Sequence, residues 1–118
     1  MSDNVFWIAE LAIRPGQLEA FKALMNDMVE ATKANEPGAL NYEWFISQDG
    51  TTCHIYERYA DSAAVMAHMG NLAAFGERWA ATVEITGATV YGAPSDEVKA
   101  IFTGQGGTLM APLGGFAR

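Results

Sequence analysis

Two ionisable side chains near the middle of the chain, Glu57 and His68, could together transfer protons. Glu57 lies in the alternating segment 52–59, and His68 lies three residues after Val65 and four before Leu72, on an apolar helical stripe. With an ordinary pKa of about 6.5, a histidine is well matched to accept a proton near neutral pH. Glu57 could orient His68, or act as the base itself if burial raises its pKa.

A pocket around these two residues would have aromatic walls, one acid and one base, and would suit a planar phenolic ligand. Residues two apart on a strand share a face, so Ile55 and Tyr59 accompany Glu57. Tyr59 or Arg78 could hold a developing oxyanion through a hydrogen bond. The candidate catalytic residues are His68 and Glu57, and the candidate substrate-binding residues are Tyr59, Ile55, Phe75, Arg78 and Trp79.

Each of these residues also has a structural interpretation. A histidine on an apolar helix face is commonly a hydrogen-bonded core residue. Glu57 could form an ion pair with a helix or with a second subunit, and Phe75 and Trp79 could simply pack in the core. The residues alone leave both interpretations open.

The elements that position these residues can be read from hydrophobic spacing. The chain has 118 residues, half of them hydrophobic, which is enough for one domain with a packed core. Apolar positions with period two predict strands, and apolar positions three and four apart predict helices. The strands are expected at 5–13, 39–48, 52–59 and 82–92, and the helices at 17–36, 62–79 and 96–102. Gly70 and Gly76 predict a kink or break in the second helix.

This order predicts an α+β, ferredoxin-like βαββαβ fold, with a four-stranded antiparallel sheet and two helices on one face. Apolar and aromatic residues occur at both parities of the strands, for example at Phe6 and Trp7. The second face therefore also needs cover, and we expect a homodimer with two sheets packed face to face. Residues 1–103 form the predicted domain. Residues 104–118 form a glycine-rich C-terminal arm that we expect to reach the partner subunit.

Composition excludes several functional classes. The formal net charge is −7 and the few cations are scattered, which argues against nucleic acid as a partner. No apolar run is long enough to span a membrane, and a single cysteine, Cys53, favours a reducing, cytoplasmic location. Cys53 and His54 point to opposite faces of a strand, and the chain has no C-x-x-C or H-x-H motif. We therefore expect no metal site.

Two motifs resemble the antibiotic biosynthesis monooxygenase domain, a family of the dimeric α+β barrel superfamily. They are E-P-G-A-L-N-Y-E-W at 36–44, and I-Y-E-R-Y-A-D-S-A-A at 55–64 with His68 following. The resemblance implies a dimer with one apolar pocket per subunit. It also implies oxidation of phenolic, quinol or polycyclic aromatic substrates by O₂ without metal or flavin. Ala9 and Trp79 stand where haem-degrading relatives carry Asn and His, so haem ligation is not expected.

These observations favour a cofactor-independent monooxygenase that oxidises a quinol or another electron-rich aromatic molecule. A hydroquinone or enol anion can itself reduce O₂, so a protein need only bind, deprotonate and desolvate it. Two alternatives remain: a dimer that binds a small molecule without catalysis, and an isomerase that works by proton transfer through His68.

Overall fold

The computed structural model describes residues 2–118, and its elements follow the predicted order up to residue 104. The strands are β1 (Val5–Ile13), β2 (Ala39–Ile46), β3 (Thr52–Tyr59), β4 (Val83–Gly92) and β5 (Thr108–Met110). The helices are α1 (Leu18–Asn35), α2 (Ser62–Leu72), the short 3-10 helix η1 (Ala73–Phe75), α3 (Gly76–Thr82) and α4 (Asp96–Gly104).

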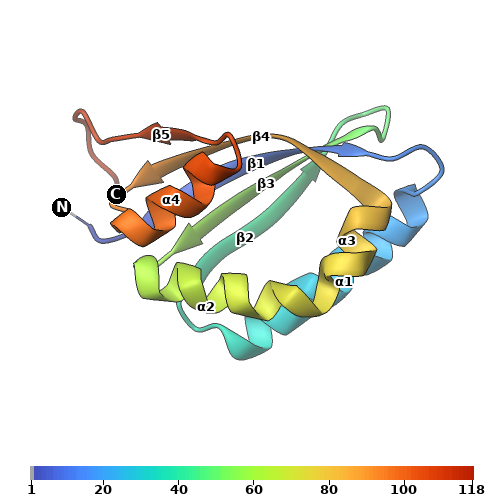
Figure 1. The fold of residues 1–118 in the computed structure, drawn as a ribbon, viewed down its shortest axis with the longest axis horizontal. Coiled ribbons are helices and arrows are strands. Elements are labelled where there is room, and N and C mark those ends of the chain that lie inside the picture. Colours follow the sequence, from blue (N-terminus) through green and yellow to red (C-terminus); the bar gives the residue numbers. More distant parts are fainter. Residues whose placement is uncertain (1) are drawn as a thin grey trace.

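The sheet has five strands in the order β2-β3-β1-β4-β5, and β5 is parallel to β4 (Figure 1). The prediction of a four-stranded, purely antiparallel sheet is therefore wrong at this edge. The physical reason is the helix between the last two strands. Helix α4 carries the chain back along the sheet, so that Thr108–Met110 runs beside Thr89–Tyr91 in the same direction. A parallel pair requires such a crossover, whereas a tight turn joins only antiparallel strands.

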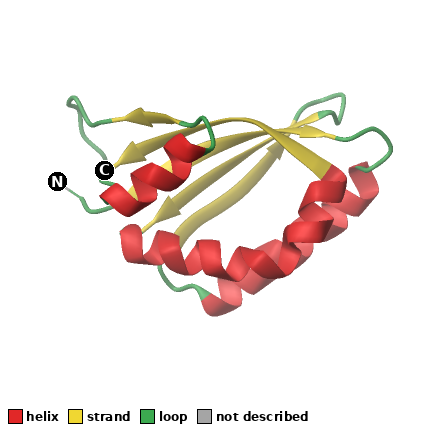
Figure 2. Cartoon of the chain, in the orientation of Figure 1, coloured by secondary structure: helices red, strands yellow, loops and turns green. Residues whose placement is uncertain are grey.

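All helices lie on one side of the sheet (Figure 2). Helix α1 buries Phe21, Leu24 and Met28 on the stripe that its apolar spacing predicts. Helix α4 covers the other end of the same face, where the ring of Phe102 lies 4.9 Å from the ring of Trp7. The helices and the sheet thus enclose a core on this face.

The predicted break in the second helix is confirmed. Helix α2 ends at Leu72, η1 makes a tighter turn, and α3 begins at Gly76. The start of α2 is fixed by Asp61, whose side chain accepts a hydrogen bond of 2.9 Å from the backbone N–H of Ala64. The resulting bend lets α2, η1 and α3 curve around the core side of the sheet (Figure 1).

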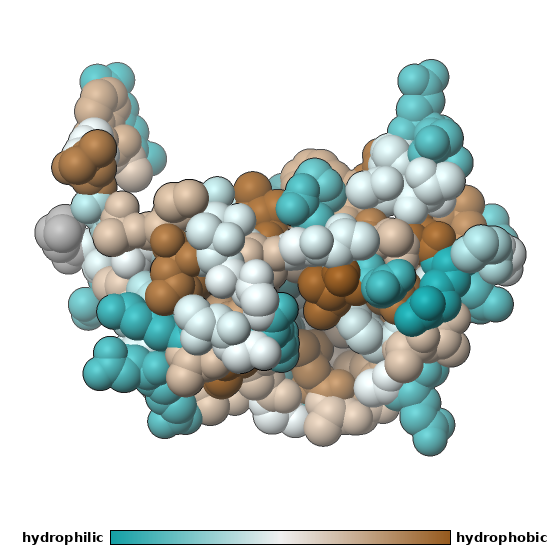
Figure 3. Space-filling model, turned by 45° about the horizontal axis from the view of Figure 1, so that its top comes forward, coloured by the Kyte–Doolittle hydropathy of each residue, from teal (hydrophilic) through white to brown (hydrophobic). Residues whose placement is uncertain are grey.

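The opposite face of the sheet, which we call the outer face, is uncovered by any helix in residues 2–118 (Figure 1). It carries Ile8 and Phe45, both exposed, and a stack of Phe6 on Tyr91 with ring centroids 5.3 Å apart. Seen with the sheet side turned forward, hydrophobic side chains reach the surface at several places (Figure 3). The sequence prediction of apolar residues on both faces of the sheet is confirmed.

The helices of residues 2–118 include none with the length and apolar character needed to cross a membrane.

Candidate active site

A buried carboxylate, Glu57, organises one end of the core. Strands β1 and β3 pair so that Trp7 lies directly opposite Glu57. The indole N–H of Trp7 donates to Glu57 Oε2 at 2.9 Å, and the hydroxyl of Tyr59 donates to Glu57 Oε1 at 2.7 Å. The rings of Trp7 and Tyr59 stack with centroids 4.8 Å apart, which fixes both donors. Two rigid aromatic residues therefore hold the carboxylate in place.

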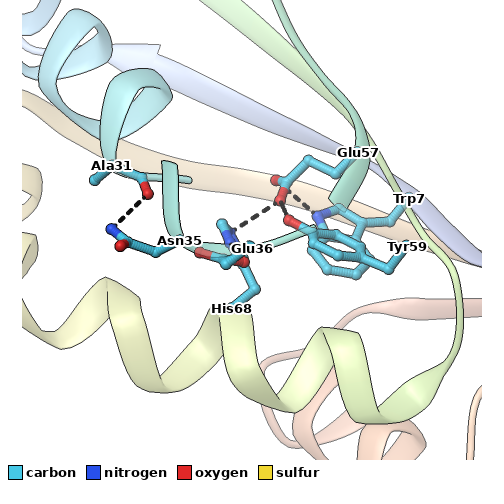
Figure 4. Close-up of polar contacts among 7 residues, drawn as sticks. All are labelled: Trp7, Ala31, Asn35, Glu36, Glu57, Tyr59 and His68. Carbon is cyan, nitrogen blue, oxygen red and sulfur yellow. Dashed lines mark hydrogen bonds and ion pairs between the residues drawn. The ribbon is translucent and has the colours of Figure 1, made fainter. Parts of the chain in front are cut away.

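The imidazole of His68 lies between two buried carboxylates (Figure 4). Its Nε2 is 3.3 Å from Glu57 Oε1, and its Nδ1 is 2.9 Å from Glu36 Oε1. The side chain of His68 is 1% exposed, so water does not screen either contact. Three groups far apart in the sequence thus form one buried cluster, which we call the Glu36–His68–Glu57 cluster.

The end of α1 explains why Glu36 points inward. Helix α1 stops at Asn35, and Glu36 has a non-helical backbone (φ −128°, ψ 82°) because Pro37 follows it. The next residue, Gly38, approaches α2 so closely that a Cβ there would lie 2.7 Å from the Cβ of Ala64. This close contact fixes the loop against the helix that carries His68.

The charges of the cluster favour a protonated His68. Burial alone lowers the pKa of His68, but the hydrogen bonds and negative charges of Glu57 and Glu36 outweigh that effect and raise it above the usual value. Burial, reinforced by the two carboxylates, also raises the pKa of the hydroxyls of Tyr42 and Tyr59. Both tyrosines are therefore neutral hydrogen-bonding groups at physiological pH.

A cavity of about 340 Å³ lies between the sheet and the helices, and Glu57 and His68 are part of its wall. Its other walls are mostly apolar and aromatic, with contributions from β1, β2, β3, β4, α1, α2, η1, α3 and α4. They are formed by Trp7, Ala9, Met28, Tyr42, Ile55, Met69, Leu72, Phe75, Gly76, Trp79, Ile85, Thr86, Gly87, Ala88, Ile101, Phe102, Gln105 and Gly106. This volume and composition are typical of a site for a small organic molecule.

The structure brings five of the seven predicted site residues together at this cavity: Glu57, His68, Ile55, Phe75 and Trp79. Tyr59 is outside the cavity wall, fully buried behind Glu57, which it contacts through its hydroxyl. Arg78 lies on the solvent side of α3, where it forms an ion pair of 2.7 Å with Asp27 of α1. Its helical neighbour Trp79 points inward, so Arg78 is directed away from the cavity.

Sequence reasoning missed Glu36 as a site residue, together with Trp7 and Tyr42. Glu36 is 32 residues from His68, and no spacing rule connects the end of one helix with the middle of another. Only the strand register, which places Trp7 opposite Glu57, distinguishes Trp7 as a site residue from an ordinary core residue. The available signal for Glu36 was its place at the end of a helix, directly before proline and glycine.

No three or more His, Cys, Asp or Glu side chains in residues 2–118 are arranged to bind a metal ion.

Comparison with known proteins identifies the family. Residues 4–85 match the family model described as "Antibiotic biosynthesis monooxygenase". The chain belongs to this family. Among its relatives is a protein of Mycobacterium tuberculosis named "Putative monooxygenase Rv0793", which is 34% identical over 71 residues, or 60% of this chain and 69% of that protein. The solved structure of Rv0793 has a TM-score of 0.66 and covers 79% of this chain and 96% of the other.

Two further solved structures share the fold of this antibiotic biosynthesis monooxygenase domain. MupZ from Pseudomonas fluorescens has a TM-score of 0.88 at 24% identity and covers 99% of this chain and 96% of its own. SnoaB from Streptomyces nogalater, described as a cofactor-independent oxygenase, has a TM-score of 0.67 at 13% identity and covers 80% and 96%. Helix α4 and β5 lie beyond the residues that the family model matches. The similarity to MupZ includes them.

Proposed function

We propose that this protein is a cofactor-independent monooxygenase that oxidises a quinol or another electron-rich aromatic molecule with O₂. The observation that carries the proposal is a buried carboxylate and imidazole in the wall of an otherwise apolar, aromatic cavity. Membership of the antibiotic biosynthesis monooxygenase family supports it. In the net reaction one oxygen atom of O₂ enters the product as a carbonyl, and the other leaves as water with two hydrogens of the substrate.

Glu57 is the proposed base. Both ring nitrogens of His68 face carboxylates, so the ring presents no free lone pair to a ligand. Glu57 Oε2 accepts one hydrogen bond, from Trp7, and a carboxylate oxygen can accept a second. In this proposal Glu57 takes the phenolic proton, and the positive charge of His68 stabilises the anion that forms. The anion then reduces O₂ without help from a cofactor.

The apolar walls define the proposed substrate contacts. Ile55, Phe75 and Trp79 supply hydrophobic and aromatic surface on which a planar ring can pack. Tyr59 acts through Glu57, since its hydroxyl is committed to that carboxylate. Arg78 is not proposed as a ligand contact, because its guanidinium binds Asp27 on the far side of α3.

Oxygen uptake tests this proposal. Wild-type protein is mixed with a panel of hydroquinones and anthrones, with no metal or flavin added, and uptake is followed with an electrode. We expect turnover of at least one member and a loss of about 10²–10⁴-fold in Glu57→Gln, the usual contribution of a general base. Glu30→Gln, an exposed position on α1, is the matched control. Tight binding of a panel member without oxygen uptake would contradict the oxygenase and favour a protein that binds a small molecule without catalysis.

An isomerase is the second candidate, because the imidazole and carboxylates of the Glu36–His68–Glu57 cluster could transfer protons without oxygen. Such an enzyme would convert an enol or lactone substrate equally well in the absence of O₂. Repeating the assay in anaerobic solution, with product analysis, separates the two reactions.

We also propose that the outer face packs against a second copy of the chain. An uncovered sheet face with exposed Ile8 and Phe45 costs hydrophobic free energy in water, and a symmetric partner removes that cost. The C-terminal arm supports the same arrangement, since Leu113 and Phe116 are almost fully exposed in the protomer.

Sedimentation velocity tests the dimer. Wild type is expected to sediment as a dimer, and Ile8→Lys to shift towards monomer because it buries a charge in the interface. Ala63→Lys, at an exposed position on α2, is the control. A monomeric wild-type protein would contradict the proposal.

A further inference from the structure

Glu36 is a buried carboxylate on the side of His68 that faces away from the cavity. It is not part of the cavity wall, but it lies at a second hollow of about 200 Å³ between α1 and the α2–η1 segment. The hollow is lined by Ala31, Thr32, Asn35, Glu36, Asn71, Leu72, Ala74 and Phe75. The Glu36–His68–Glu57 cluster, drawn in Figure 4, therefore lies between the cavity and the second hollow.

We propose that Glu36 is a positioning residue that holds His68 doubly protonated and exchanges its proton with solvent through this second hollow. The inference rests on the proposed function, since it explains why Glu57, and not His68, is the base of that site. It concerns the protein without substrate as well, so it can be tested separately.

The geometry requires two donors on one ring. A neutral imidazole has a single N–H and one lone pair. If Nδ1 lost its proton, its lone pair would face Glu36 Oε1 at 2.9 Å; if Nε2 lost its proton, its lone pair would face Glu57 Oε1 at 3.3 Å. While both glutamates are ionised, either arrangement places two buried acceptors against each other, and only the imidazolium donates to both carboxylates.

Among residues 2–118, Glu36 and Glu57 are the charged groups that act on the His68 ring. The titratable side chains that face His68 are Glu36 after α1, Glu57 and Tyr59 on β3, and Tyr42 on β2. The rings of Tyr42 and Tyr59 lie 5.2 and 5.0 Å from the imidazole, and both are neutral phenols. Two carboxylates therefore act on one ring. Removal of the Glu36 charge leaves a single ion pair.

The second hollow gives the proton a path that does not cross the cavity. The N–H bond at Nδ1 breaks as an O–H bond forms on Glu36, and the ring keeps its Nε2 proton on Glu57. Water in the hollow then takes the proton from Glu36, and the reverse sequence reloads the ring. Thr32, Asn35 and Asn71 supply polar atoms for such water. A ligand that closes the cavity would leave this exchange open.

Nuclear magnetic resonance of protein labelled with ¹⁵N in the histidine rings tests the first part. At pH 7, both ring nitrogens of His68 are expected to be protonated in wild type and in Glu30→Gln. In Glu36→Gln, one nitrogen is expected to lose its proton and the ring to titrate at a lower pH. A neutral His68 in wild type, or an unchanged ring in Glu36→Gln, would overturn the proposal. If Glu36→Gln does not fold, the wild-type spectrum alone decides.

Hydrogen exchange at His68 Nδ1 tests the second part. Ala74→Leu places a larger apolar side chain at the hollow and is expected to slow the exchange several-fold. Ala73→Leu, at an exposed neighbour that lines neither space, is the matched control and should leave it unchanged. Equal exchange rates in the two variants would exclude the hollow as the route. Because these measurements use free protein, they can succeed even if no substrate consumes oxygen.

Discussion

The two histidines of this chain lie on opposite faces of the same sheet, and each has a carboxylate partner. On the outer face, His54 Nε2 is 3.5 Å from Glu10 Oε1, and both side chains are about half exposed (49% and 50%). On the helix side, His68 contacts Glu36 and Glu57 with 1% of its side chain exposed. The same chemical pairing has different consequences, because water screens the first and is excluded from the second.

This difference in burial indicates which of the two sites could transfer a proton to a ligand. In the single protomer, solvent screens the outer pair, which therefore contributes little to either stability or reactivity. The inner cluster instead combines a buried charge, fixed geometry and an adjoining cavity, which are the conditions for proton transfer to a ligand.

Replacing each histidine in turn should give the largest difference in stability between the two sites. His68→Ala leaves two buried carboxylates without their shared partner and is expected to cost about 3–5 kcal/mol of unfolding free energy. His54→Ala removes an exposed partner and should cost about 1 kcal/mol or less. Urea denaturation of both variants at one protein concentration measures the difference, and equal losses would contradict the assigned role of burial.

Gly38 provides a test of the loop–helix contact that holds the Glu36–His68–Glu57 cluster. Gly38→Ala forces a Cβ against Ala64 of α2 and should destabilise the protein by about 1–3 kcal/mol. The double variant Gly38→Ala with Ala64→Gly removes the clash at the cost of a helical glycine, about 1 kcal/mol. Thermal unfolding should therefore show partial recovery in the double variant. No recovery would mean that the close approach of loop and helix is not the cause.

The pH dependence of stability should separate the two histidines further. Because the pKa of His68 is raised in the folded protein, its stabilisation is complete below about pH 6.5 and is lost as pH rises through its folded pKa. The slope for one proton is at most about 1.4 kcal/mol per pH unit. His54→Gln should keep this dependence, and His68→Gln should abolish it. Denaturation curves between pH 6 and 9 provide the measurement, with a pH-independent wild type as the contrary result.

Most of the fold followed from periodicity alone. The alternation in Thr52–Tyr59 and the apolar stripe from Phe21 to Met28 gave the strand and helix that the structure contains. Strand β5 was not predicted, because its three residues follow a glycine-rich stretch and are too few to show a period-two hydrophobic pattern. Its pairing depends on where α4 docks, through Val98 and Phe102, which is a tertiary property.

Part of the site was also predictable. Strand parity and helix spacing brought Glu57 and His68 to one cavity, as the sequence indicated. Parity could not distinguish Ile55, which reaches the cavity, from Tyr59, which is enclosed by the core beside Trp7. It also could not reveal Glu36, since the end of α1 meets α2 through tertiary packing, including the close approach of Gly38 to Ala64.

A crystal structure with bound substrate would show whether Glu57 is placed to act as the base. Crystals of the wild-type protein are soaked, without oxygen, in the hydroquinone or anthrone that supports the fastest oxygen uptake. We expect an aromatic ring between Phe75 and Trp79, with its hydroxyl within hydrogen-bonding distance of Glu57. A ligand bound elsewhere, or in the cavity with its hydroxyl turned away from Glu57, would contradict the assignment of the base.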